Sequence, residues 1–174
     1  MNNLKALAMA IVCIALGLPL GALTQTAQAP AAPIPSGGSG LGTHSPNSPI
    51  APLPARADVV PWAVLGDIGY KTEKARVLPV FKGAQLAMDQ KKQRVQGFML
   101  PLEPGERQRH FLLTSVPMSC SFCTPGGPES MVEVRTQTPV KYSLEPVVVE
   151  GLFSVLRDDA YGLLYRITDA ISVK

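Results

Sequence analysis

The stretch Val147-Val148-Val149-Glu150-Gly151-Leu152-Phe153 carries the strongest β-strand signal of this 174-residue sequence. Valine and aromatic side chains dominate it, and such residues favour a pleated, half-buried strand. Gly151 stands inside the stretch, where a strand that coils around a barrel can bend. We therefore expect a strand over 146–156 and a curved sheet around it.

Further strands are predicted on the N-terminal and C-terminal sides of this stretch, over residues 94–101, 108–116, 130–136 and 161–170. The first two are joined by a Pro-Gly turn and predict a β-hairpin, with Gly97 as a second interior glycine. Five strands with little helix predict a mainly β domain. Its expected architecture is a small, strongly curved, OB-like barrel, and the alternative is an open β-sandwich.

The residues ahead of these strands have weaker patterns. Trp62, Val64 and Leu65 are expected to form an apolar plug or a first short strand. Residues 67–76 are polar and predicted to be irregular. A short helix is expected within 82–90, with Leu86 and Met88 partly buried.

The N-terminal residues 1–29 have the pattern of an export signal or a membrane anchor. Lys5 precedes an apolar, uncharged run over residues 6–23, and Ala27-Gln28-Ala29 fits a signal-peptidase site. The run is also near the minimum length of a spanning helix, so an uncleaved inner-membrane anchor is the alternative. In both cases the rest of the chain is expected to be translocated into the periplasm.

Residues 30–57 contain seven prolines and four glycines and almost no charge, which predicts a disordered linker. The folded domain is then expected to span 58–174. From Asp58 onward there are 14 Lys and Arg against 13 Asp and Glu. This balance argues against a nucleic-acid-binding domain, which would carry a basic surface. His-Glu-x-x-His, Gly-x-Ser-x-Gly and phosphate-loop motifs are absent from the sequence, and no enzyme activity is predicted.

The chemistry of the predicted domain centres on Met118-Ser-Cys120-Ser-Phe122-Cys123-Thr-Pro125-Gly-Gly-Pro128. Cys13 lies in the N-terminal segment, so Cys120 and Cys123 are the only cysteines of the region from residue 58 onward. Thiols that reach an oxidising compartment tend to pair, which predicts a disulfide between them. A metal site is a second possibility, because two thiolates at this spacing can hold one ion.

The metal hypothesis needs further ligands. His110 would suit zinc, and Met118 would suit Cu(I), which favours soft sulfur donors. A third hypothesis is thiol–disulfide exchange, although Pro125 and its neighbours oppose the helix on which reactive Cys-x-x-Cys pairs usually lie. A fourth is protein docking, with Phe122 as an exposed apolar anchor at the loop tip.

Three stretches together resemble a known protein family: Gly97-Phe98-Met99-Leu100-Pro101-Leu102, His110–Leu113 leading to Cys120–Pro128, and Val147–Gly151. The similarity covers about residues 60–170. It is to a family of exported bacterial proteins known only as a domain of unknown function, with a GFMxPL…CxxCxPGGP pattern. The resemblance implies a secreted or membrane-attached periplasmic protein with an OB-like barrel. Some members are encoded beside zinc-related transporter genes, which implies a metal-handling context.

The leading functional hypothesis is therefore an exported accessory binding protein in zinc or copper transport or homeostasis, with the Cys120–Cys123 loop as its working site. Its expected partner is a periplasmic or membrane transport component. The alternative is a structural or docking domain of a periplasmic or membrane complex, in which these cysteines form a disulfide.

Overall fold

The computed structural model describes residues 40–174, so the predicted signal or anchor at 1–29 lies outside the described residues. The elements of the described chain are α1 (Trp62–Gly66), β1 (Gly69–Glu73), β2 (Arg76–Val80), α2 (Gly83–Met88), β3 (Lys91–Pro101), β4 (Arg107–Thr114), the 3₁₀ helix η1 (Pro128–Ser130), β5 (Met131–Lys141), β6 (Val147–Val155) and β7 (Tyr165–Val173). Within residues 40–174, no helix has the length and hydrophobicity that a membrane-spanning helix needs.

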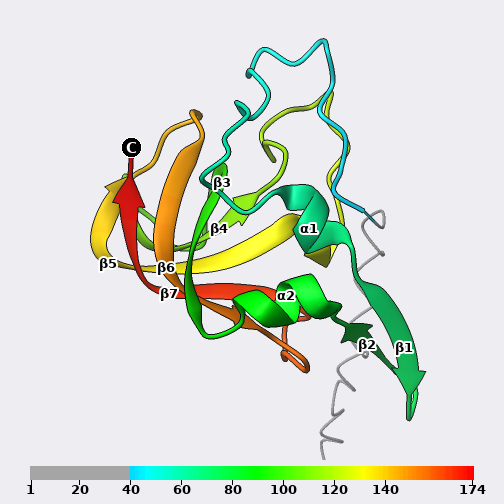
Figure 1. Ribbon diagram of the computed structural model, residues 1–174. Helices are drawn as coiled ribbons and strands as arrows, with labels where there is room; N and C mark the ends of the chain where they lie inside the picture. Colours follow the sequence, from blue (N-terminus) through cyan, green and yellow to red (C-terminus); the bar gives the residue numbers. More distant parts are fainter. Residues whose placement is uncertain (1–39) are drawn as a thin grey trace, which may run out of the picture. The chain divides into compact units, whose positions relative to one another are not determined.

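The strands β3 to β7 close into one barrel in the order β3-β4-β5-β7-β6 (Figure 1). Strands β5 and β7 are parallel, and every other pair in the barrel is antiparallel. If β3 is counted as strand 1 and β7 as strand 5, the strand order is 1-2-3-5-4. The pairing of strand 1 with strand 4 closes the barrel. The mainly β, OB-like barrel is confirmed, and the sheet closes instead of opening into a sandwich.

Both interior glycines lie where barrel strands bend or approach closely. Strand β3 pairs with β6 up to Gly97 and with β4 from Phe98 onward. A Cβ at Gly97 would lie 2.9 Å from the backbone oxygen of Thr114. At Gly151 the register between β6 and β7 shifts, as expected for a bulge. A bent strand such as β3 can therefore pair with one neighbour along its first half and with the other along its second half. This allows five strands to close a small barrel.

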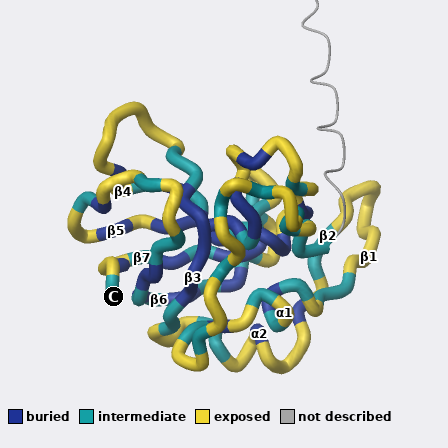
Figure 2. Tube along the Cα trace, turned by 90° about the horizontal axis from the view of Figure 1, so that it is seen from above, coloured by how far each residue is buried: buried dark blue, intermediate teal, exposed yellow. Residues whose placement is uncertain are grey.

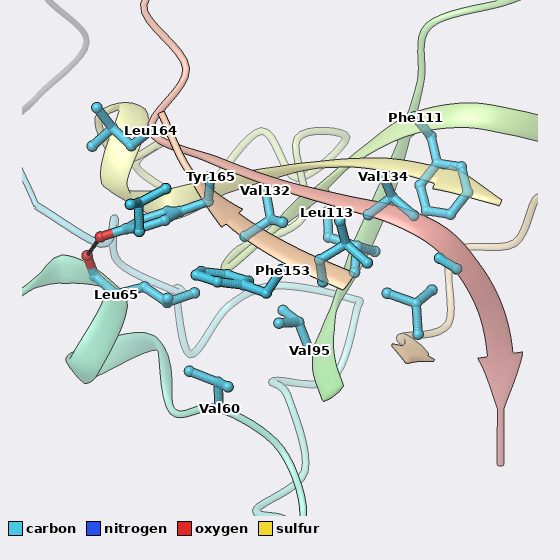
Figure 3. Close-up of a cluster of buried hydrophobic side chains, with 14 of the residues drawn as sticks. Val60, Leu65, Val95, Phe111, Leu113, Val132, Val134, Phe153, Leu164 and Tyr165 are labelled. Atoms are coloured by element: carbon cyan, nitrogen blue, oxygen red, sulfur yellow. Dashed lines mark hydrogen bonds between the residues drawn. The ribbon is translucent and has the colours of Figure 1, made fainter. Parts of the chain in front are cut away.

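The core fills the barrel with side chains from alternate positions of the strands (Figure 3). Tyr165, Phe153 and Phe111 are its largest fully buried side chains. The rings of Phe153 and Tyr165 stack with their centroids 5.5 Å apart. The Tyr165 hydroxyl donates a hydrogen bond of 2.6 Å to the backbone oxygen of Leu65, which lies in α1. The expected plug therefore forms, but as a short helix and not as a strand.

Two expectations about the shorter elements are wrong. Residues 67–76 are not irregular throughout, because β1 pairs with β2 as a two-stranded ribbon that projects from the barrel (Figure 2). Its exposed, polar residues lack the alternation that marks a half-buried strand. In α2, Leu86 is exposed, whereas Gln85 is fully buried and its side-chain amide donates to the backbone oxygens of Val64 and Asp67.

Candidate functional site

The cysteine loop lies between β4 and η1. Cys120 and Cys123 are joined by a disulfide, with their Cα atoms 5.4 Å apart. The backbone N–H of Cys123 also donates to the Cys120 oxygen, so the bond closes a single tight turn. A disulfide leaves neither sulfur as a thiolate, the form that binds metals and attacks disulfides. This geometry is the one that the disulfide alternative expects.

Residues 40–43 lie across this loop and form a strap. Thr43 and Thr124 exchange two backbone hydrogen bonds of 2.9 and 3.0 Å, and the Gly127 N–H donates to the Gly40 oxygen at 2.8 Å. A Cβ on Gly126 would lie 2.6 Å from the backbone nitrogen of Gly42, so only glycine allows this approach. This part of the segment that we expected to be a disordered linker is therefore held by backbone hydrogen bonds.

The side chain of Glu129, in η1, also holds the strap. Its buried carboxylate accepts the Gly40 N–H at one oxygen and the Tyr70 hydroxyl, at 2.7 Å, at the other. Burial raises the pKa of Tyr70, and the neighbouring Glu129 carboxylate adds to the rise. Glu129 therefore joins the strap to the β1–β2 ribbon.

The predicted ligand His110 does not form a metal-binding group with the two cysteines. His110 lies on β4, where its Nε2 is 2.7 Å from Oε1 of Glu133. Met118 and Phe122 are exposed on the cysteine loop, Phe122 with 64% of its surface accessible. Among residues 40–174, no group of three or more His, Cys, Asp or Glu side chains is placed to hold a metal ion.

A different site lies on the outer surface of β4, β5 and β7. Val132 and Val134 of β5 point into the core, so Glu133 and Arg135, which alternate with them, point outward. Here a cavity of about 410 Å³ is lined by Leu102, His110, Leu112, Glu133, Arg135, Tyr161, Leu163 and Arg166. These residues come from three strands and from the β3–β4 and β6–β7 loops.

Glu133 forms the polar centre of this cavity. Glu133 is only 3% exposed, and both of its carboxylate oxygens accept hydrogen bonds. Oε1 accepts from Arg135 at 3.0 and 3.1 Å and lies beside His110, and Oε2 accepts from Arg166. Burial by itself would raise the pKa of Glu133, but the hydrogen bonds from Arg166, His110 and Arg135 outweigh it and lower the pKa. The carboxylate is therefore ionised at neutral pH.

The β6–β7 loop is shaped by Asp159. Its Oδ2 accepts the backbone N–H groups of Tyr161, at 2.9 Å, and Leu163, at 3.3 Å. Gly162 between them has a φ of +74°, which glycine adopts without strain. The loop thereby presents Tyr161, 87% exposed, at the rim of the cavity, and Leu163 in its lining.

This arrangement can bind a ligand, because it combines an apolar lining with a few fixed polar groups. From the sequence we singled out only His110, for a different role. Glu133 and Arg135 alternate with core valines, which marks an outward-facing pair and nothing more. Arg166 and Tyr161 reach the cavity only through the pairing of β5 with β7, and a local sequence pattern does not encode that pairing.

Comparisons with known proteins give one family. A family model described as "Protein of unknown function (DUF3299)" matches residues 66–163. Among solved structures, the chain is similar to a DUF3299 family protein from Pseudomonas aeruginosa PAO1, with 26% sequence identity and a TM-score of 0.42. The similar region covers 51% of this chain and 64% of that chain, so it spans less than two thirds of the relative. A comparison with curated proteins finds no match.

Proposed function

Because this chain belongs to DUF3299, a family of proteins of unknown function, we propose its function from its own geometry. We propose an exported, non-enzymatic accessory binding domain whose working surface is the outer face of β4 and β5. The Cys120–Cys123 disulfide then serves as a structural staple. The family match agrees with the resemblance, seen in the sequence, to a family of unknown function. Export of the chain is part of the proposal.

The position of the cavity is the observation that supports this proposal. In five-stranded barrels of this order, ligands bind on the outer face of strands 2 and 3, between the 1–2 and 4–5 loops. Those strands are β4 and β5 here, and the loops are β3–β4 and β6–β7. Leu102 comes from the first loop, Tyr161 and Leu163 from the second, and His110 and Arg135 from the strands. The fold indicates only where a ligand would lie, and the side chains of the cavity determine what it binds.

The proposal does not retain the cysteines as a metal site. Both proposed thiolate ligands are used in the disulfide, and His110 is occupied by Glu133 on a different part of the barrel. A chain purified without reductant or chelator should therefore contain no free thiol in residues 40–174. It should also bind zinc and copper no more tightly than its Cys120→Ser/Cys123→Ser variant. Metal binding that this double substitution abolishes would restore the metal hypothesis.

The binding face is tested with a photoreactive amino acid placed in the native host, at Leu112 in one variant and at Leu144 in a matched control. Leu112 lines the cavity, whereas Leu144 is exposed in the β5–β6 loop and lines a separate cavity of about 200 Å³. After irradiation, intact-mass measurement detects small and macromolecular adducts alike. We expect an adduct at position 112 that is absent at 144. Equal adducts at both positions, or none at 112, would contradict the proposed face.

A further inference from the structure

We infer that the cavity on β4, β5 and β7 binds an aliphatic carboxylate, with the acid group at Arg135 and the hydrocarbon over Leu102, Leu112 and Leu163. This inference rests on the proposed function, because it names the ligand class of the same face. A medium-chain fatty acid and the chain end of a peptide with an apolar last residue both carry this chemistry.

The ion pairs of the cavity decide where a charged ligand group can bind. Two guanidinium groups, those of Arg135 and Arg166, face one carboxylate, that of Glu133. Arg166 is held between Glu133 and Asp159. With Asp159 counted, the two guanidinium groups meet two carboxylates and the cluster is neutral. An anion is therefore favoured locally, at the guanidinium of Arg135, which contacts Glu133 but not Asp159.

The guanidinium of Arg135 is accessible to an anion. Its Nε and Nη2 donate to Glu133, and within residues 40–174 its Nη1 makes no hydrogen bond. The side chain is 57% exposed, against 4% for that of Glu133. A guanidinium fixed along one edge presents its other edge in a defined plane, and planar donors of this kind match a carboxylate. Glu133 therefore acts as a positioning residue for Arg135.

Apart from His110, which is bonded to Glu133, the remaining lining is mainly apolar and comes from one strand and two loops. Leu102 lies in the β3–β4 loop, Leu112 on β4 and Leu163 in the β6–β7 loop, with Tyr161 at the rim. A cavity of about 410 Å³ lies within the usual size range of small-ligand pockets. It is large enough for an aliphatic chain, and burying that chain supplies affinity that an isolated ion pair at a surface would not.

The experiment titrates the full chain with decanoate, decanol and decyltrimethylammonium below their micelle concentrations, using calorimetry and NMR shift mapping. We expect decanoate to bind about tenfold more tightly than decanol, and the cation to bind least, because a charge-assisted hydrogen bond is lost or replaced by repulsion. Shifts should concentrate at Leu112 and Arg135. N-acetyl-leucyl-leucine is titrated in the same way. If it binds more tightly than decanoate, the ligand is a peptide chain end, and if decanoate binds more tightly, the ligand is a free aliphatic acid.

Matched variants separate the two halves of the site. Arg135→Gln should reduce decanoate affinity about tenfold and leave decanol unchanged. Leu112→Asn should weaken both. Arg94→Gln is the control, since Arg94 is also a strand arginine bonded to a glutamate, Glu150, but lies away from the cavity. Its decanoate affinity should equal that of the wild type, and unchanged melting temperatures verify folding.

Equal affinities for decanoate and decanol, or decanoate binding that is insensitive to Arg135→Gln, would overturn the inference. If neither carboxylate binds while the photoreactive residue at position 112 still forms its adduct, the ligand class is wrong and the binding face stands. If that adduct is absent as well, the proposed function fails together with the inference.

Discussion

Glu133 is the most heavily bonded ionisable side chain of the described barrel, and its environment makes a pH-dependent contribution to stability. Burial opposes its ionisation, but Arg166, His110 and Arg135 favour it and lower the pKa below the ordinary 4.5. A carboxyl whose pKa is lower in the folded than in the unfolded state stabilises the fold above the unfolded pKa. That contribution is lost as the pH falls through the folded value.

We therefore predict that Glu133→Gln lowers the free energy of unfolding by about 2 kcal/mol at pH 7, because two arginines lose a buried charged acceptor. The difference between variant and wild type should begin to shrink as the pH falls below about 4.5, where the unfolded chain binds a proton at Glu133, and should vanish once the folded carboxylate is protonated at a lower pH. Urea unfolding at several pH values measures this. A difference that stays constant down to pH 2 would show that Glu133 does not act through its charge.

At the scale of elements, the cysteine loop, the strap at 40–43 and η1 form one unit. The disulfide closes the turn at Cys120–Cys123, and the residues just after it bind the strap through backbone hydrogen bonds. Two side chains also hold the strap, because Glu129 accepts the Gly40 N–H and the Ser115 hydroxyl donates to the Leu41 oxygen. Thr43, however, is held by Thr124 of the loop itself. A change in the loop should therefore be detectable in the strap.

Reducing the disulfide should lower the free energy of unfolding by about 2 kcal/mol, the small value that the chain-entropy model assigns to a short ring. Amide exchange at Thr43 and Thr124 should accelerate more than exchange in β6. Hydrogen exchange with and without a dithiol reductant measures both effects. The Cys120→Ser/Cys123→Ser variant should behave like the reduced chain, and unchanged exchange at Thr43 would show that the strap is independent of the disulfide.

Gly126→Ala should release the strap without touching the cysteines. The new Cβ would lie 2.6 Å from the backbone nitrogen of Gly42, and a backbone atom can give way only if the segment moves. We expect faster amide exchange at Thr43 and Gly127, with the disulfide still intact by mass. Gly83→Ala is the control, because a Cβ there meets nothing within 4 Å. Equal protection in both variants would contradict the close packing of the strap.

At the scale of the whole molecule, stability depends on barrel closure. Strand β3 contacts both β4 and β6, and β7 fills the last position between β5 and β6. Closure leaves the barrel without free strand edges, which would otherwise pair with other chains. It also depends on close backbone approach where β6 crosses β7.

Gly151→Ala should destabilise the barrel by about 1–3 kcal/mol, the usual cost of overpacking. Its Cβ would lie 2.6 Å from the backbone oxygen of Thr168 and 2.7 Å from Cγ2 of Ile167. Thermal unfolding measures the loss, and Gly83→Ala should keep or slightly raise the melting temperature. A Gly151→Ala variant as stable as the wild type would mean that β6 and β7 can separate at the bulge without cost.

The sequence by itself determined the mainly β class, the five barrel strands, the two glycines at which they bend, and the nearness of Cys120 to Cys123. These features are local, because side-chain period and propensity act over a few residues. Only the tertiary structure decided that β5 and β7 run in parallel, that Gly40–Thr43 crosses the cysteine loop, and that Leu112, Glu133 and Arg166 share one cavity. Such pairings join distant residues, and they are set by which strand arrangement buries the core best, a property of the whole chain.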